Sequence, residues 1–528
     1  MQIRCLLRNS LQNIHISRQN DGYLLLLHVM GVRSIFSKPV ASYIIAKQKK
    51  WAADPGGYQK SQLMKLIRKG QHTQFGHDHD FSAIHNYEDF KDHVPISDYE
   101  EFSNYINQVL QGEKDVLWPG KPLYFAKTSG TTSGVKYIPI TQDSISNHIN
   151  GARDALLNYI HETGKSNFLE GKLIFLSGSP ELEEKQGIKI GRLSGISNHF
   201  VPAYLRSNQM PSYETNCIED WEEKIERIID ETLDKNMTLI SGIPPWVQMY
   251  FDRIKERTGK KIHDVFPNFS LFVYGGVNFE PYRKKLLESI GTEIDSIELF
   301  PASEGFFAFQ DKREDPSMLL IQNAGIFYEF VPVSEYHNEN PTRLNIDQVE
   351  TGINYAMIVN SSAGLWGYAL GDTIKFTSIR PPKILFTGRT KHFISAFGEH
   401  VISEEVERSI QYAMQNHPEV ELVEFTVAPQ VNPSEGLPLH EWFVEFSRPP
   451  DDIASFEEAV DKKLQELNPY YFDLVSGAIL RPLKIKTLRH GAFRDYMRSR
   501  GKLGGQNKVP RLSNGREIAN ELENFVII

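Results

Sequence analysis

Cysteine is almost absent from this chain, which has two cysteines in 528 residues. Cys5 and Cys217 have no spacing typical of a metal site and suggest no disulfide framework. Such sparse cysteine is typical of a reducing compartment, so we expect a cytoplasmic protein.

Long hydrophobic runs are also missing. No apolar run approaches the roughly 18 to 20 residues needed to cross a bilayer, so we expect no membrane span. Near the N-terminus, Arg4, Arg8 and Arg18 precede the apolar run Tyr23–Val29. This run is short for a signal peptide, and no small-residue cleavage site follows it. We expect residues 1–29 to be a poorly ordered leader, with Met30 a candidate for the true start.

The chain also has no excess of positive charge. The net charge is −9 and the isoelectric point about 6.0, so we expect no nucleic-acid or anionic-membrane partner. A chain of this length is too long for one compact unit, and we expect one large and one smaller domain. The composition gives no prediction of the oligomeric state.

Short apolar runs alternate with helical patterns over the first 300 residues, which predicts a largely parallel sheet covered by helices. The expected strands are Leu123–Ala126, Lys172–Leu176, Met237–Ile240, Ser270–Tyr274 and Ser296–Phe300. The expected helices are Gln62–Lys69, Asp98–Leu110, Trp221–Asp234, Trp246–Arg257 and Tyr282–Ser289.

The pattern changes near Tyr328, after which strands follow one another without long helices, as in an antiparallel sheet. These strands are Gly325–Val333, Asn354–Asn360, Thr373–Ser378 and Ile384–Thr387. A further α-β-β-α pattern predicts a small domain: a helix capped by Ser403, strands Glu421–Ala428 and Glu441–Phe446, and helix Phe456–Leu467. The expected fold is therefore α/β, α+β over the whole chain, with a large domain at 30–388 and a small mobile domain at 389–528.

A run rich in hydroxyl groups and glycine, Thr128–Lys136, lies between two expected strands. Glycine lets backbone amides approach a phosphate closely, hydroxyls donate further hydrogen bonds, and Lys136 supplies positive charge. We therefore predict a phosphate-binding loop. Besides Lys136, its predicted contact residues are Thr128, Ser129, Gly130, Thr131, Thr132, Ser133 and Gly134.

The loop is not a Walker loop, because its spacing is Gly-x3-Gly-x-Lys and the following segment, Tyr137–Ile140, is strand-like. On composition alone, an ordinary Ser/Gly hairpin connection is an equally good interpretation. The order of the residues favours the phosphate loop, since a strand, Thr-Ser-Gly-Thr-Thr-Ser-Gly and then Lys is the pattern of acyl-adenylate-forming enzymes.

Four more motifs follow this loop in the sequence. Taken singly, they are also explained by a strand end, a hairpin turn or a solvated basic surface. The motifs are Phe300-Pro-Ala-Ser-Glu-Gly305, Ala363-Gly-Leu-Trp-Gly-Tyr-Ala-Leu-Gly-Asp372, Gly388-Arg-Thr-Lys391 and Gly504-Gly-Gln-Asn-Lys-Val-Pro-Arg511. In this order, from about Met30 to the C-terminus, the chain resembles the acyl-acid amido synthetases typified by plant auxin-responsive proteins of the Gretchen Hagen type. That family is a branch of the luciferase and acyl-CoA synthetase superfamily.

The resemblance implies that Glu304 binds the Mg²⁺ that accompanies ATP, beside Ser303. Mg²⁺ usually takes one or two protein carboxylates together with phosphate oxygens and water, which fits this role. Phe300 stands where plant members carry Tyr, so an aromatic face for the adenine is kept but a hydroxyl is lost.

The third motif implies nucleotide contacts by Tyr368 and Asp372, with the Asp372 carboxylate accepting hydrogen bonds from the ribose hydroxyls. Plant members carry Arg where Gly367 and Ala369 stand here. If those arginines hold phosphate or substrate, this chain lacks that function or places it elsewhere.

The last two motifs imply a hinge and a mobile catalytic lysine. Arg389 is expected near the ribose, and Lys391 at the hinge or on the nucleotide. Lys508 is expected to stabilise charge as carboxylate and α-phosphate join, although Asn507 replaces the family's Tyr and a charged helix face is an equally good interpretation.

The sequence thus predicts an ATP- and Mg²⁺-dependent ligase that adenylates a carboxylic acid and passes the acyl group to an amine, an amino acid by resemblance. Two alternatives stay open. An acyl-CoA ligase shares the first step, and a non-catalytic nucleotide-binding relative keeps the fold without turnover.

Overall fold

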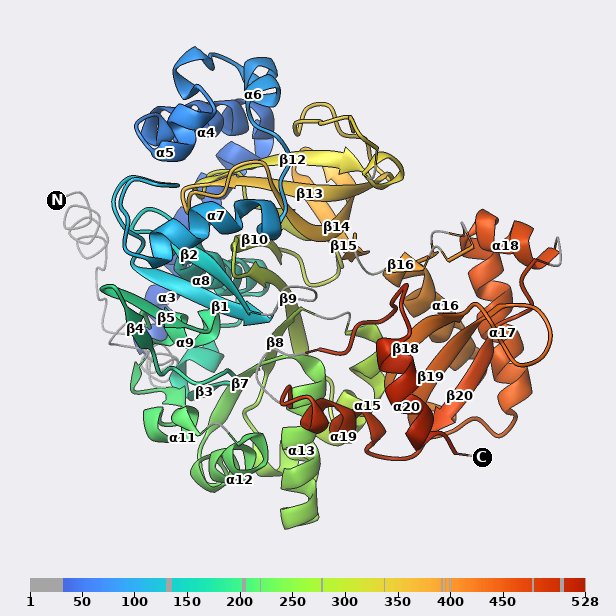
Figure 1. Cartoon of the computed structure of the whole chain (residues 1–528). Helices are drawn as coiled ribbons and strands as arrows, with labels where there is room; N and C mark the ends of the chain where they lie inside the picture. The colour runs from blue at the N-terminus through green and yellow to red at the C-terminus, as the bar shows by residue number, and fades with distance from the viewer. Residues whose placement is uncertain are drawn as a thin grey trace, which may run out of the picture.

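The computed structural model gives the arrangement of most of the chain (Figure 1). It describes residues 32–129, 135–201, 206–218, 220–276, 279–336, 338–390, 393–394, 396–397, 399, 401–476, 479–503 and 508–527.

One eleven-stranded sheet forms the centre of the large domain, in the order β12-β13-β14-β15-β11-β10-β9-β8-β7-β3-β6. Its strands are β3 (Lys172–Phe175), β6 (Gln209–Met210), β7 (Met237–Ser241), β8 (Leu271–Gly275), β9 (Asp295–Ala302), β10 (Gly305–Gln310), β11 (Met318–Leu320), β12 (Ile326–Pro332), β13 (Asn354–Ser361), β14 (Tyr368–Ile379) and β15 (Pro382–Arg389). Strands β6, β3, β7, β8 and β9 pair with one another in parallel, and the other neighbours in this sheet pair antiparallel, as expected. The two parts join in one sheet through the hairpin of β9 and β10, and β10 was not among the expected strands.

Helices cover both faces of the parallel part. Ile240 and Phe272 pack toward α12 (Trp221–Thr232), α13 (Pro244–Thr258) and α15 (Glu280–Ile290). Their neighbours Leu239 and Leu271 pack toward α3 (Val32–Ala53) and α8 (Ile145–Thr163). Successive side chains of a strand point to opposite faces, so this alternation confirms a sheet buried on both sides.

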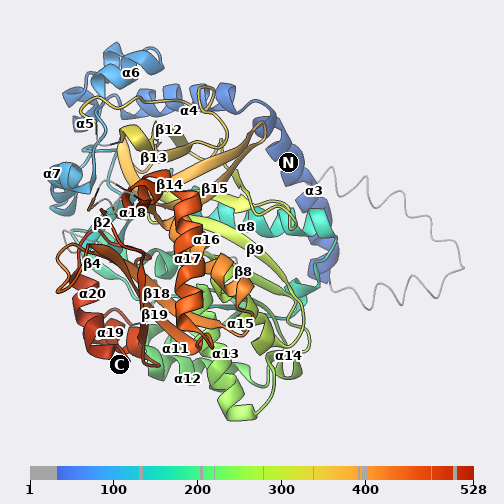
Figure 2. The same cartoon turned by 90° about the vertical axis from the view of Figure 1, so that its right-hand side faces the viewer.

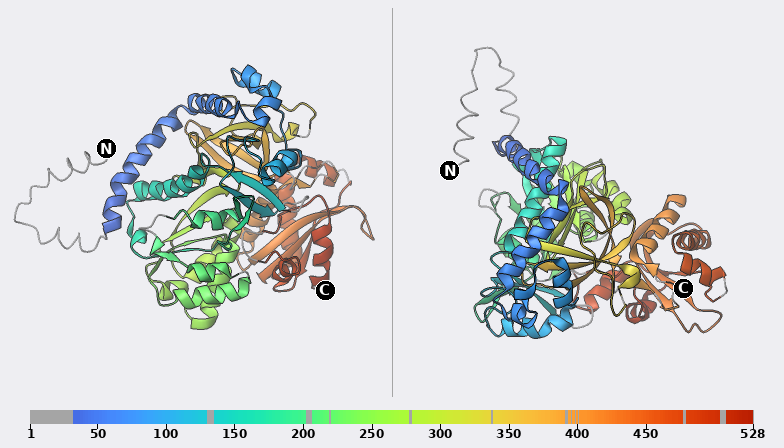
Figure 3. Two further views of the ribbon diagram at one scale, coloured as in Figure 1. Left: turned by 60° about the vertical axis from the view of Figure 1, so that its left-hand side comes forward. Right: turned by 90° about the horizontal axis from the view of Figure 1, so that it is seen from above.

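The sequence did not indicate α3 or α8, which lie against each other along one side of the domain (Figure 3). Helix α3 contains Pro39, and its apolar residues are not gathered on one face. Helix α8 buries the polar side chains of Asn147, His148 and Asn158. Helix α3 therefore lacks the apolar stripe on which periodicity arguments depend, and in α8 the buried polar residues interrupt it.

A second sheet, in the order β2-β1-β5-β4, carries the predicted phosphate loop. Its strands are β1 (Tyr124–Ser129), β2 (Val135–Ile140), β4 (Glu183–Lys185) and β5 (Ile188–Gly191). Strands β1 and β2 pair antiparallel with Thr128 opposite Lys136, which confirms the expected strands on both sides of the loop.

Shorter elements complete the large domain. Helix α7 begins after its N-cap Asp98, whose carboxylate accepts from the backbone N–H of Glu100 and Glu101. The other helices are α4 (Pro55–Gly70), α5 (Gln74–Asp78), α6 (Tyr87–His93), α7 (Tyr99–Leu110), α9 (Leu193–Asn198), α11 (Tyr213–Cys217) and α14 (Ile262–Val265). The 3₁₀ helices are η1 (Phe81–Ala83), η2 (Asn167–Glu170) and η3 (Val333–Glu335).

The C-terminal part has its own three-stranded sheet, in the order β18-β19-β20. Helices α16, α17 and α18 cover one face, and α19 and α20 the other (Figure 2). Strand β20 was not expected. The elements are β16 (Phe393–Ile394), β17 (Val401–Ile402), α16 (Ser403–Asn416), β18 (Glu421–Gln430), β19 (Leu439–Arg448), α17 (Ile453–Leu467), α18 (Pro469–Ser476), β20 (Lys484–Leu488), α19 (Ala492–Ser499), α20 (Glu517–Leu522) and η4 (Glu523–Phe525).

The predicted capping role of Ser403 is wrong. Ser403 is the first residue of α16, and the N-cap position belongs to Ile402. The Ile402 backbone N–H instead donates to the Glu405 carboxylate at 3.0 Å, which satisfies one exposed donor of the first turn.

The mixed α/β fold is as expected. Within the described ranges, no helix has the length and apolar character needed to cross a membrane. The expected leader, residues 1–29, lies outside the described residues, and the boundary at 388–391 stays a prediction.

One packing contact of α8 gives a stability prediction. Gly151 lies against Phe306, and an added Cβ would overlap its ring. We expect Gly151→Ala to lower the free energy of unfolding by about 1–2 kcal/mol, because overpacking exceeds the gain in helix propensity. Ser146→Ala, at an exposed site of the same helix, should change it by less than about 0.5 kcal/mol. Denaturant unfolding measures both, and an unchanged midpoint for Gly151→Ala would contradict this packing.

Candidate active site

Ser303 and Glu304 form the turn between β9 and β10, where the parallel and antiparallel parts of the large sheet meet. Both residues are partly buried. The first residues of β10 are fixed from behind by Asn147 of α8. Its side chain accepts from the Phe306 N–H at 2.6 Å and donates to the Phe306 carbonyl at 3.0 Å. The turn is therefore held by the core rather than by a mobile loop.

Strands β14 and β15 bring three further predicted residues to this turn. Asp372 lies opposite Arg389 in the strand register, and Arg389 Nε donates to Asp372 Oδ1 at 2.9 Å. Asp372 is buried, whereas about half of the Arg389 side chain is exposed. Tyr368 is buried at the start of β14, and its hydroxyl is hydrogen-bonded to Glu304. The second, third and hinge motifs therefore meet in one cluster.

Burial raises the pKa of the Glu304 carboxyl, and the nearby charge of Asp372 raises it further. Lys136 and Arg389 act in the opposite direction. The charge of Asp372 in turn raises the pKa of Arg389. Two carboxylates and two cations thus lie within electrostatic reach of one another, an arrangement suited to a metal ion and a polyanion.

Lys136, which follows the predicted phosphate loop, lies within electrostatic reach of the same cluster. Its ammonium lies 5.2 Å from the centre of the Tyr99 ring, and the Tyr137 N–H donates to the Tyr99 hydroxyl at 2.9 Å. Thr128 and Ser129 end β1. The remaining predicted loop contacts, Gly130, Thr131, Thr132, Ser133 and Gly134, lie outside the described residues. Tyr99 was missed because, in the sequence, it is only the first residue of an ordinary helix.

Phe300 is buried, with its ring edge-to-face against Phe307 and Phe386 at centroid distances of 5.4 and 5.5 Å. Phe386 of β15 is instead 36% exposed and lies three residues before Arg389. The aromatic surface available to a ligand is therefore that of Phe386 rather than Phe300.

Lys508 reaches this cluster from the small domain. Its ammonium donates to the carbonyl of Gly276, just beyond β8. Lys508 is an exposed residue overall, yet burial around its ammonium, with the nearby charge of Arg389, lowers its pKa to about 8. Asp372 acts in the opposite direction. Lys391, the predicted hinge residue, lies outside the described residues.

Three family domains cover most of the sequence. They are the GH3 family N-terminal domain at residues 44–212 and 193–294, the central domain at 319–389 and the C-terminal domain at 404–517. The chain belongs to the GH3 family. This result confirms the resemblance inferred from the motifs.

Relatives of this GH3 protein match it over most of their length at low identity. A jasmonoyl–L-amino acid synthetase, JAR4 of Nicotiana attenuata, is 20% identical over 87% of this chain and 91% of its own. The indole-3-acetic acid-amido synthetase GH3.15 of Arabidopsis thaliana is 23% identical over 83% and 87%. The solved structure of a GH3.15 acyl acid amido synthetase has a TM-score of 0.75 at 19% identity, covering 92% of this chain and 96% of that one. A 2-hydroxyisobutyryl-CoA ligase has a TM-score of 0.56 at 12% identity over 91% and 92%.

The two arginines that plant GH3 members carry in the third motif have no place in this backbone. Gly367 has φ +54°, and an added Cβ would overlap the carbonyl oxygen of Pro95. Ser97 is hydrogen-bonded to the strand here, donating to the Gly367 carbonyl and accepting from the Ala369 N–H, both at 2.9 Å. Ala369 is buried in a small apolar cluster with Val331, Ala356 and Ile358. The packing of the linker between α6 and α7 against β14 therefore leaves no room for these two arginines.

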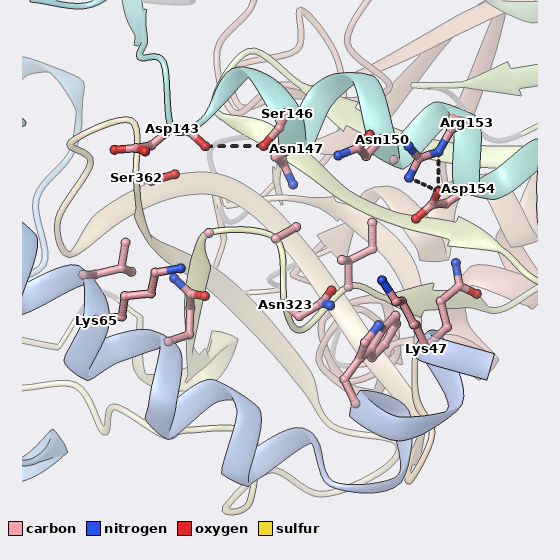
Figure 4. Close-up of a pocket in the computed structure, with 18 of the residues that line it drawn as sticks. Lys47, Lys65, Asp143, Ser146, Asn147, Asn150, Arg153, Asp154, Asn323 and Ser362 are labelled. Atoms are coloured by element: carbon pink, nitrogen blue, oxygen red, sulfur yellow. Dashed lines mark hydrogen bonds and ion pairs between the residues drawn. The ribbon is translucent and has the colours of Figure 1, made fainter. Parts of the chain in front are cut away.

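A pocket of this GH3 protein lies elsewhere, between α3, α4 and α8 (Figure 4). It has a volume of about 360 Å³, and none of the predicted site residues that the structure describes lines it. Its charged side chains include the ion pairs Lys69–Asp143 and Arg153–Asp154, both at 2.6 Å.

Proposed function

We propose that this protein activates a carboxylic acid with ATP and Mg²⁺ and transfers the acyl group to an amine, most simply an amino acid. The observation that carries the proposal is the convergence of Glu304, Asp372, Arg389 and Lys136 within electrostatic reach of one another, with Lys508 added from the small domain. Packing of the fold alone does not require such a set of charged side chains, whereas binding of a triphosphate with a metal ion does.

In the first half-reaction, a carboxylate oxygen of the acid bonds to the α-phosphorus of ATP and pyrophosphate leaves. Lys136 and the hairpin that contains it are suited to hold the phosphates, and Asp372 with Arg389 to hold the ribose. Lys508 supplies positive charge where negative charge develops. Mg²⁺, when bound, neutralises phosphate charge.

The donor set fits Mg²⁺. Glu304 offers carboxylate oxygens, and no group of three or more His, Cys, Asp or Glu among the described residues suits a metal ion. A site with one or two carboxylates leaves coordination positions for phosphate oxygens and water, which is the usual arrangement for nucleotide-bound Mg²⁺.

In the second half-reaction, the amine nitrogen bonds to the acyl carbon, AMP leaves with the bonding electrons, and the nitrogen gives up a proton. The names of the relatives, jasmonoyl–amino acid and indole-3-acetic acid-amido synthetases, support an amine as acceptor. The scarcity of cysteine supports a cytoplasmic location.

The acceptor is tested by AMP release over a panel of carboxylic acids. We expect an amino acid to accelerate AMP release with at least one acid, and coenzyme A to leave the rate unchanged. Acceleration by coenzyme A alone would contradict an amido synthetase and indicate an acyl-CoA ligase. No pyrophosphate exchange with any acid would favour a non-catalytic relative.

A further inference from the structure

The segment that carries Lys508 is anchored to the small domain along β18. Thr426 Oγ1 donates to the Pro510 carbonyl at 2.7 Å, and the Val427 N–H donates to the Arg511 carbonyl at 2.9 Å. The Ser513 N–H donates back to the Val427 carbonyl at 3.0 Å. Lys508 therefore moves with β18, and its position at the active site depends on how β18 is held against the large domain.

Arg511, three residues after Lys508, is buried at this domain contact. Its guanidinium donates to the carboxylates of Glu424 in β18 and Glu407 in α16, the second at 3.1 Å. It also donates to the hydroxyl of Tyr282, which belongs to α15 of the large domain. A planar guanidinium can satisfy several acceptors at once, so Arg511 links three elements.

Tyr282 completes the network from the other side. Its hydroxyl donates to Glu424 Oε1 at 3.0 Å while accepting from Arg511. The ring is 5% exposed and belongs to the core that packs α15 on the large sheet. Helix α15 contacts β18 directly, and Figure 1 shows it next to the small domain. The core of the large domain thus holds the Tyr282 hydroxyl in place, where it binds the Arg511–Glu424 ion pair of the small domain.

We propose that Tyr282 is a positioning residue for the adenylation half-reaction. Through Glu424 and Arg511 it holds the Lys508 segment against the large domain, with the Lys508 ammonium at the Gly276 carbonyl and within reach of the Asp372–Arg389 pair. This inference rests on the proposed function, because Lys508 is useful there only if a carboxylate is adenylated.

The Tyr282–Glu424–Arg511 network should affect the two half-reactions differently. If the small domain turns between the two half-reactions, as the resemblance implies, these contacts exist only in the orientation described here. Removing the Tyr282 hydroxyl then disfavours the orientation that serves adenylation and leaves the orientation that serves amide formation untouched. A residue with a merely structural role would slow both steps together.

Tyr282→Phe is the test, with Tyr250→Phe as the matched control. Tyr250 is also fully buried, and its hydroxyl bonds to Thr232 within the large domain at 2.7 Å. We expect Tyr282→Phe to lower ATP–pyrophosphate exchange about tenfold, the effect of losing one buried hydrogen bond to charged partners. Amide formation from supplied acyl-adenylate should change less than about twofold, and Tyr250→Phe should leave the ratio of the two rates unchanged. Equal loss in both half-reactions, or no loss in exchange, would overturn the proposal.

The double variant shows whether Tyr282 acts through Lys508. In a Lys508→Ala background, Tyr282→Phe should cause no further loss of exchange, whereas a second tenfold loss would overturn the proposal. Small-angle scattering gives a readout that needs no turnover, since Tyr282→Phe should expand the protein and Tyr250→Phe should not. If the Tyr282→Phe protein expands but the wild type shows no exchange, only the proposed function is contradicted. If the Tyr282→Phe protein does not expand and its exchange is normal, only the role of Tyr282 is contradicted.

Discussion

Glu304→Gln is expected to lower the rate of Mg²⁺-dependent adenylation by about 100- to 1000-fold, the loss typical of removing one group that stabilises transition-state charge. The substitution keeps the size of the side chain and its ability to accept from Tyr368, but removes the negative charge that faces Lys136 and Arg389. ATP–pyrophosphate exchange measured against Mg²⁺ concentration should show both a lower maximum and a higher Mg²⁺ requirement.

Glu183→Gln is the matched control for this experiment. Glu183 is an exposed carboxylate on β4 that pairs with Lys127 at 3.4 Å, so exchange should stay near the wild-type rate. Thermal unfolding of Glu304→Gln should match that of the wild type, because the buried charge is lost without a change of shape. If Glu304→Gln catalyses exchange at the wild-type rate, Glu304 does not bind the metal ion.

Lys508→Ala is expected to lower adenylation by about 100-fold or more, since the ammonium is the one predicted catalytic group that the small domain supplies. Because its pKa is lowered to about 8, raising the pH through this value discharges the group in the free enzyme. The value of kcat/KM for ATP, which reports the free enzyme, should therefore fall as the pH rises above about 8.

Lys508→Arg tests whether a positive charge at this position is sufficient or whether the lysine side chain itself is required. Arginine stays protonated in this range, so any activity that this variant keeps should lose the fall near pH 8. Lys502→Ala, at an exposed lysine before the same segment, should leave the rate and the pH profile unchanged. Full activity in Lys508→Ala would contradict the catalytic assignment and favour the charged-surface interpretation of this motif.

The site residues predicted from the sequence are those that belong to short local motifs. The Ser303–Glu304 turn, the Asp372 position after a glycine and the hairpin that ends in Lys136 each occupy a few neighbouring residues. Their chemistry can therefore be recognised before the chain is folded. The structure brings the described members together at the junction between the parallel and antiparallel parts of the sheet.

The residues that the sequence did not identify act through space. Tyr99 lies under Lys136, and Tyr282 contacts Arg511 across 229 residues of chain. Phe386, rather than Phe300, carries the exposed ring because burial depends on which strands flank it. No local pattern specifies such partners, since each is an ordinary helix or strand residue until the packing is known.

The position of an isotope tests the central claim, acyl-adenylate chemistry at this site, most directly. An acid that supports turnover, labelled with ¹⁸O in its carboxylate, is converted with ATP and an amine, and the products are analysed by mass. Attack of the carboxylate on the α-phosphorus followed by amide formation must leave one labelled oxygen in AMP and one in the amide. Label in AMP is the predicted result. Label in inorganic phosphate with formation of ADP, or unlabelled AMP, would contradict the account.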